Sequence, residues 1–176
     1  MVAITIMAIL ATIVYANIGS ANPKARDAER QADLRNLQVA IDQFKLKNGR
    51  YPAAGCGVSA GSIASENDCP AYIAGLSPEY ITVMPKDARR GSAVGYAYVT
   101  NAGGTSYKVM ARGTVESETV TSAHPMKSCD TTDICNYGCG TEALQNTSYA
   151  LWGGFAGNDG NTPAQVKTAT ALVICR

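Results

Sequence analysis

The sequence predicts an α+β protein in which a long N-terminal helix packs on an antiparallel β-sheet and disulfides staple the C-terminal region. Three observations support this fold class: an apolar run leading into a charged amphipathic segment, two alternating segments joined by a turn, and an even number of cysteines after the helix. We divide the chain into an apolar helix half with a breaker at 1–22, an amphipathic helix half at 23–49 and a globular head at 50–176.

Composition limits the class of protein. A chain of 176 residues is long enough for one domain with a sizeable core. The formal net charge of +1 argues against a protein whose main role is to bind polyphosphate. Seventeen glycines and a charged fraction of 16% favour an extracellular, loop-rich head over a coiled coil.

The first eighteen residues carry no charge. About twenty apolar residues span a bilayer, so this run is borderline as a membrane helix. No basic region precedes the run and no cleavage site follows it, which disfavours a cleaved secretory signal. We prefer a membrane or filament-core segment over a helix buried in a soluble core. The candidate assembly residues are Met1, Ile4, Ile6, Ile9, Leu10, Ile13 and Val14.

A breaker follows between Gly19 and Pro23. Glycine weakens a helix interior, and proline removes a backbone donor and disfavours helical geometry in the residue before it. We therefore expect a kink or a locally melted turn. The alternative is a new helix start, with Asn22 as the N-cap and Pro23 at the first helical position.

The next segment is strongly helical. Leu34, Leu37, Ile41 and Phe44 recur at steps of three and four and therefore lie on one face, which we expect to pack on the sheet. Mixed charges fill the other positions and indicate a solvated face, although opposite charges could also pair between neighbouring copies. If residues 1–47 form one helix, it is roughly 70 Å long at ~1.5 Å per residue. The small head cannot cover such a rod, so lipid or other copies must bury its first half.

The end of the helix and a hairpin come next. Asn48-Gly49 indicates a C-cap. Residues 94–98 and 107–112 alternate, and the turn residues 101–105 between them predict a hairpin. The tyrosines on these strands fit core packing better than a platform on which bases stack.

Six cysteines lie in the head: Cys56, Cys69, Cys129, Cys135, Cys139 and Cys175. In an oxidising compartment they predict three disulfides, with fifteen pairings open. Cys56 and Cys69 close a local loop, and Cys175 would tie a strand at 169–175 to the 129–139 loop. A further strand is predicted at 149–155.

We expect no metal, cofactor or catalytic site. His124 with the cysteines at 129–139 has zinc-ligand chemistry, but the spacing lacks a paired C-x2-C element. Residues 157–161 offer oxygen ligands for calcium, yet they lack the acidic alternation of an EF-hand and fit a plain turn better. A single histidine gives no visible nucleophile–base pair.

The run MVAITIMAILATIV and the segment ARDAERQADLRNLQVAIDQFKLKNGRYP resemble the type IV pilins and the related type II secretion pseudopilins. Residues 76–87 and the predicted hairpin are similar to later parts of that family. The resemblance begins just after the family's mature N-terminal block, which places the processing site and the assembly glutamate before Met1. Ala16 stands where the family has its usual proline, so Gly19 and Pro23 are assigned the weakening role.

The resemblance implies a non-enzymatic subunit that polymerises through its N-terminal helix into a cell-surface filament. The implied partners are further copies of the chain, the cytoplasmic membrane before assembly and the pilus assembly machinery, with host surfaces or DNA unassigned. Adhesion, twitching motility and DNA uptake are the family's roles, and some pseudopilins bind calcium in their terminal loops. The elaborate region 121–176 favours a type IV pilus subunit over a pseudopilin. The rival class is a membrane-tethered, monomeric extracytoplasmic domain.

Overall fold

A computed structural model describes residues 2–59, 63–89, 91, 94–121, 124–128 and 146–154, with side chains from Asn22 onward. The described chain contains a helix, α1 (Val2–Asn48), and four strands, β1 (Ala64–Ser65), β2 (Gly95–Thr100), β3 (Tyr107–Arg112) and β4 (Tyr149–Gly153). The strands form an antiparallel sheet in the order β1-β2-β3-β4. The predicted α+β class is therefore confirmed, as are the hairpin and a strand near residue 149.

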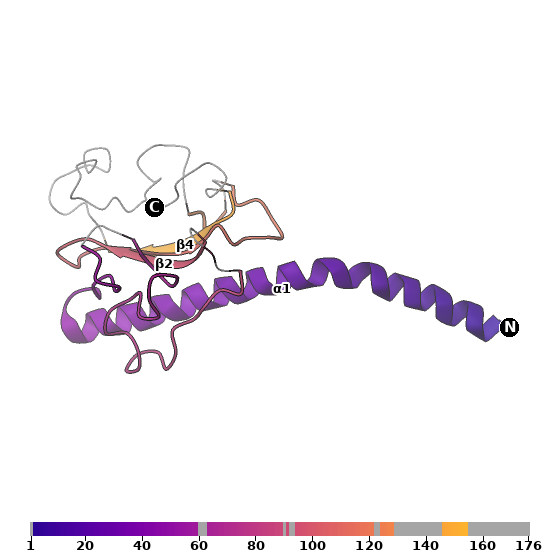
Figure 1. Cartoon of the computed structure of the whole chain (residues 1–176), viewed down its shortest axis with the longest axis horizontal. Helices are drawn as coiled ribbons and strands as arrows, with labels where there is room; N and C mark the ends of the chain where they lie inside the picture. Colours follow the sequence, from indigo (N-terminus) through magenta and orange to yellow (C-terminus); the bar gives the residue numbers. More distant parts are fainter. Residues whose placement is uncertain are drawn as a thin grey trace.

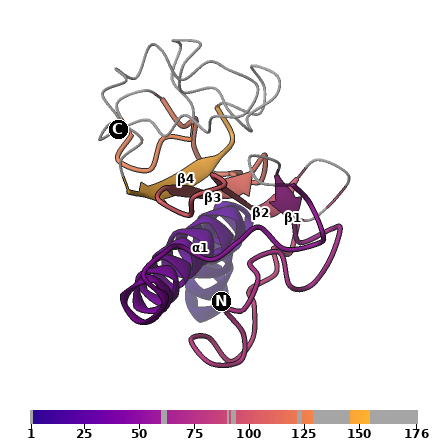
Figure 2. The same cartoon turned by 90° about the vertical axis from the view of Figure 1, so that its left-hand side faces the viewer.

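The helix is much longer than the sheet that it supports. Figure 1 shows the C-terminal half of α1 lying under the sheet, while its N-terminal half projects away from the head. Figure 2, along the helix, shows the sheet on one side of α1 and the chain of the 50–90 region beside it. The head thus covers only the second half of the helix.

Neither the locally melted turn nor the new helix start expected between Gly19 and Pro23 appears in α1. The helix runs from Val2 to Asn48 with Pro23 inside it, and Figure 1 shows it curving without a gap. Proline lacks the N–H that would bond to the carbonyl four residues earlier, which is that of Gly19. A helix with one missing hydrogen bond can bend and continue, because the bonds on either side remain.

The helix ends where the sequence predicts. Gly49 adopts a positive φ of 74° and donates its N–H to the carbonyl of Lys45 at 2.8 Å. The Asn48 side chain donates to the carbonyl of Phe44 at 2.9 Å. Together these bonds satisfy two carbonyls that the last turn would leave without partners.

The core lies between α1 and the sheet. Leu34, Leu37 and Ile41 are fully buried and belong to one cluster with Tyr98 and Val109 of the sheet. The tyrosines are packed edge-to-face or stacked, with ring centroids 4.5 Å apart for Tyr51–Tyr107 and 6.0 Å for Tyr98–Tyr107. They form core contacts, as expected.

The opposite face of the sheet is buried as well. Ala97, Met110 and Ala150 form a second cluster, with Ile63 and Trp152 packed against it. Lys108 lies on this face and donates its Nζ to the carbonyl of Ser128 at 2.5 Å. Burial lowers the pKa of Lys108 to about 7, because the charged ammonium loses hydration.

A disulfide joins Cys56 to Cys69 and closes the loop between them, as predicted. The remaining four cysteines, the strand expected at 169–175 and the calcium-like segment 157–161 lie outside the described residues.

Candidate assembly site

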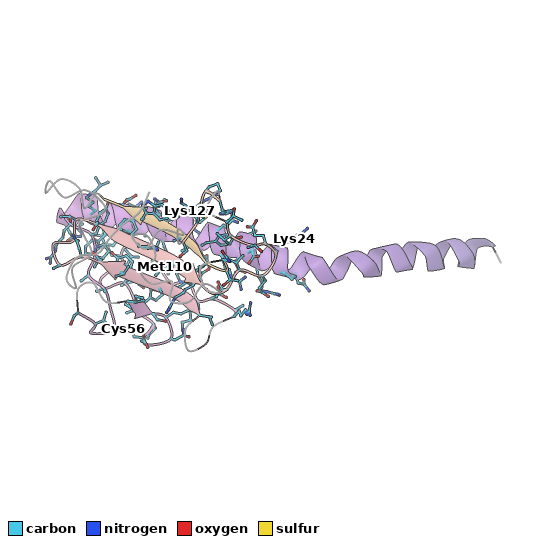
Figure 3. The ribbon with its side chains drawn as sticks, turned by 90° about the horizontal axis from the view of Figure 1, so that it is seen from above. Lys24, Cys56, Met110 and Lys127 are labelled. Atoms are coloured by element: carbon cyan, nitrogen blue, oxygen red, sulfur yellow. A yellow bond between two sulfur atoms is a disulfide. The ribbon has the colours of Figure 1, made fainter. Side chains whose placement is uncertain are left out.

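Ion pairs fasten the head to α1 near the point where the helix leaves the sheet. Figure 3 labels Lys24, beyond which α1 projects without the side chains of the head around it. Within two turns of Lys24 the helix presents Arg26, Asp27 and Arg30 to two loops of the head. We call Arg26, Asp27, Arg30, Asp87 and Glu116 the junction.

Arg30 is the central cation of the junction. Its guanidinium donates from Nε and Nη2 to the two carboxylate oxygens of Asp87 at 2.7 and 3.0 Å. It also donates to Asp27 at 2.5 Å and to Glu116 at 2.8 Å. Its side chain is only 3% exposed. The planar fork of arginine suits this multiple carboxylate binding, which a lysine could not reproduce.

Asp27 binds the loop that follows β3 through backbone groups. Its carboxylate accepts hydrogen bonds from the N–H of Glu116 at 3.1 Å and from the N–H of Ser117 at 2.7 Å. It also accepts the hydroxyl of Ser117 at 2.5 Å. Backbone N–H groups need hydrogen-bond acceptors, and in a sheet a neighbouring strand supplies them. In this loop the Asp27 carboxylate supplies them instead.

The electrostatics favour the charged forms of these groups. Burial by itself would raise the pKa of Asp27, but the hydrogen bonds from Ser117, Arg30 and Glu116 lower it overall. The hydrogen bond from Arg26, helped by Arg30, lowers the pKa of Glu116 to about 2. Burial opposes the charge on Arg30, yet its three carboxylate partners raise the pKa of Arg30 further.

A buried carboxylate extends the junction into the sheet. Glu66 accepts hydrogen bonds from the N–H of Asp87 at 3.1 Å and from the N–H of Tyr96 at 2.8 Å. Gly95 has a φ of +121°, and a Cβ there would lie 2.3 Å from a Glu66 oxygen. Glycine is therefore required at Gly95, and Glu66 links β2 to the loop that binds Arg30.

The junction sets how the projecting helix is held. It ties α1 to the loop at Asp87 and to the loop at Glu116 through buried and half-buried ion pairs.

The predicted packing residues lie together on the face of α1 toward the sheet. Leu34, Leu37 and Ile41 are fully buried, and Phe44 is half-buried with its ring centroid 5.4 Å from that of Tyr80. The predicted assembly residues from Ile4 to Val14 lie on the projecting part of α1, and their side chains, like all of Met1, lie outside the described residues.

The junction was missed by sequence reasoning, which assigned the mixed charges of 24–47 to a solvated face. Asp27 and Arg30 stand three residues apart, a spacing that allows an ion pair on one helix face. That spacing could not reveal Asp87 and Glu116, which are 57 and 86 residues from Arg30 along the chain.

Within the described ranges, no group of three or more histidine, cysteine, aspartate or glutamate side chains is arranged to hold a metal ion. His124 contacts Glu118 at 3.4 Å and accepts the N–H of Met126 at 3.1 Å.

A search of the described residues for a helix with the length and hydropathy of a membrane span finds none.

Comparison with known proteins identifies relatives. The family model described as type II secretion system (T2SS), protein G matches residues 17–126. The chain is 37% identical over 60 residues to type II secretion system core protein G of Pectobacterium carotovorum subsp. carotovorum, covering 34% of this chain and 38% of the relative. It is 32% identical over 88 residues to the Escherichia coli (strain K12) protein of the same name, covering 49% and 59%.

These matches span less than two thirds of each relative's length. No solved structure matches the chain significantly. The comparisons support the pseudopilin alternative and correct our preference for a type IV pilus subunit. That preference rested on the elaborate, cysteine-rich region 121–176, most of which lies beyond the family match that ends at residue 126.

Proposed function

Since the chain belongs to the family of type II secretion system protein G, we propose that it is a pseudopilin, a non-enzymatic subunit that polymerises into a periplasmic or surface filament of a secretion system. The observation that carries this proposal is the family match, which covers part of α1, the hairpin and both loops of the junction. We further propose that the fold is pilin-like, with α1 as the spine and residues 50–176 as the displayed head.

The shape of the molecule supports this role. The N-terminal half of α1 projects beyond the head (Figure 1), and a lone apolar helix would be costly in water. Packing residues 1–18 against the same segment of other copies would remove that surface from water, with a gain of about 25 cal/mol per Å2 buried. Before assembly the segment would lie in the cytoplasmic membrane, and its partners there would be the other components of the secretion machinery.

A gene deletion in the organism that carries this chain tests the proposal. We expect the mutant to lose release of secreted enzymes into the medium, measured by activity in the culture supernatant, while surface pili remain visible by electron microscopy. Complementation with the intact gene should restore release. Loss of surface pili with normal enzyme release would reject the pseudopilin role and favour a type IV pilus subunit, with its adhesion, twitching or DNA-uptake functions.

A further inference from the structure

An open groove of about 530 Å3 runs between α1 and the segment 81–86. One wall carries Glu29 and Asp33, which stand one turn apart on the helix. The other wall includes the apolar residues Ile81 and Val83 and one cation, Lys86. Val83 is 71% exposed, so this wall offers uncovered apolar surface.

The helix wall has an excess of negative charge. Within the described residues neither Glu29 nor Asp33 forms an ion pair, and Asp33 accepts only the hydroxyl of Tyr96 at 2.7 Å. Burial, together with the charges of Glu29 and Asp87, raises the pKa of Asp33 even though Tyr96 opposes the shift. Arg26 and Arg30 bind the carboxylates of the junction, so Lys86 is the cation that faces Glu29 and Asp33 among the described lining residues. Two carboxylates and one lysine leave the groove with a formal charge of −1, which a cation from outside the groove can neutralise.

A complementary surface lies on another side of the same helix. Arg35 is exposed and forms no ion pair within the described chain, and Val39, one turn later, is 57% exposed. At 3.6 residues per turn, Arg35 lies roughly 120° around the helix from Glu29 and roughly 160° from Asp33. One copy therefore cannot bring Arg35 into its own groove, but a neighbouring copy can.

We propose that the groove is a contact surface for a second copy of this chain, whose Arg35 binds beside Glu29 and Asp33 while its Val39 covers Val83. The two surfaces are different, so the contact is heterologous. A heterologous contact that does not close on itself produces an open helical filament. This inference deepens the proposed function and rests on it, because it names one contact within the filament.

The test is a charge exchange in the full-length chain, with the amount of sheared filament measured by sedimentation and electron microscopy. Glu29→Lys and Arg35→Glu each place like charges together, and we expect each to reduce filament yield about tenfold. The combined variant Glu29→Lys/Arg35→Glu restores opposite charges across the contact and should recover yield to within about threefold of the unaltered chain. Both positions are exposed, so thermal unfolding of the detergent-solubilised variants should be unchanged.

Asp68→Lys is the matched control, because it makes the same charge change at an exposed position on the disulfide loop and should assemble normally. If single variants assemble fully, or the combined variant stays defective, the groove contact is wrong while filament formation by the unaltered chain still supports the proposed function. If the unaltered chain forms no filaments, the filament role fails and this contact fails with it.

Discussion

At the residue scale, Arg30 determines how the buried charges of the junction are balanced. It is the cation shared by Asp27, Asp87 and Glu116, and both it and Asp87 are almost fully buried. A buried ion pair adds little net stability compared with an apolar pair, since desolvation offsets the attraction. Removal of one partner is different, because the remaining charges keep the desolvation cost and lose the attraction.

Arg30→Met keeps most of the apolar stem and removes the charge. We expect it to lower the free energy of unfolding by about 3 to 5 kcal/mol, since Asp27 and Asp87 would remain buried without their cation. Urea unfolding of the detergent-solubilised chain, followed by tryptophan fluorescence, measures this. Arg35→Met is the matched control at an exposed position and should change stability by less than about 0.5 kcal/mol. Equal effects of the two variants would contradict the central role of Arg30.

At the element scale, α1 shows that a proline can lie within a long helix without ending it. Pro23 has no N–H to donate to the Gly19 carbonyl, so one backbone hydrogen bond of the helix is missing. The two residues expected to break the helix are the two ends of that missing bond. The hydrogen bonds on either side hold the backbone, and the helix bends instead. In the part of α1 beyond the head, this defect is the natural site of bending.

Pro23→Ala should close that defect. The new N–H of residue 23 can bond to the Gly19 carbonyl, and removal of an interior proline favours the helix by about 3 kcal/mol. Hydrogen exchange followed by NMR, on the full chain in detergent micelles, should show a protected amide at residue 23. Gly19→Ala is the control, because it raises helix propensity by only about 1 kcal/mol and restores no bond. A rapidly exchanging amide at residue 23 would show that the helix is open there.

At the scale of the whole molecule, the head and the projecting half of α1 occupy separate parts of the structure (Figure 1). The described contacts of α1 with the head begin at Arg26, and its core residues begin at Leu34, while the N-terminal half of the helix projects beyond the sheet (Figure 1). We therefore expect folding of the head not to depend on the apolar half, and the proposed assembly to depend on it.

A chain that lacks residues 1–22 should fold and remain monomeric. We expect a circular dichroism spectrum with both helix and strand, a cooperative thermal transition and a monomer mass by sedimentation equilibrium. The Asp27 and Arg30 contacts with the head are retained in this fragment, so the junction should stay intact. Filament formation by the fragment would show that the apolar half is not the assembly element, and failure to fold would show that the head depends on it.

Much of this architecture follows from local sequence signals. The 3.6-residue period identified Leu34, Leu37 and Ile41 as the buried face, Asn48-Gly49 indicated the helix end, and alternation around residues 101–105 indicated the hairpin. Each of these signals acts within a few residues, so one sequence is sufficient to find it. The Cys56–Cys69 pairing was also predicted, because the two cysteines bound one short loop.

The long-range features were not accessible in this way. A charged residue such as Lys108 in an alternating strand normally marks a solvent-exposed face. Here the second face of the sheet is also buried, and Lys108 is buried with it. The junction likewise joins helix charges to Asp87 and Glu116, whose proximity depends on how the loops fold back. The sequence by itself determined a helical spine with an antiparallel head, because hydrophobic periodicity and turn chemistry are local. Only the tertiary structure decided which charges are buried together, because pairing across more than fifty residues depends on the path of the whole chain.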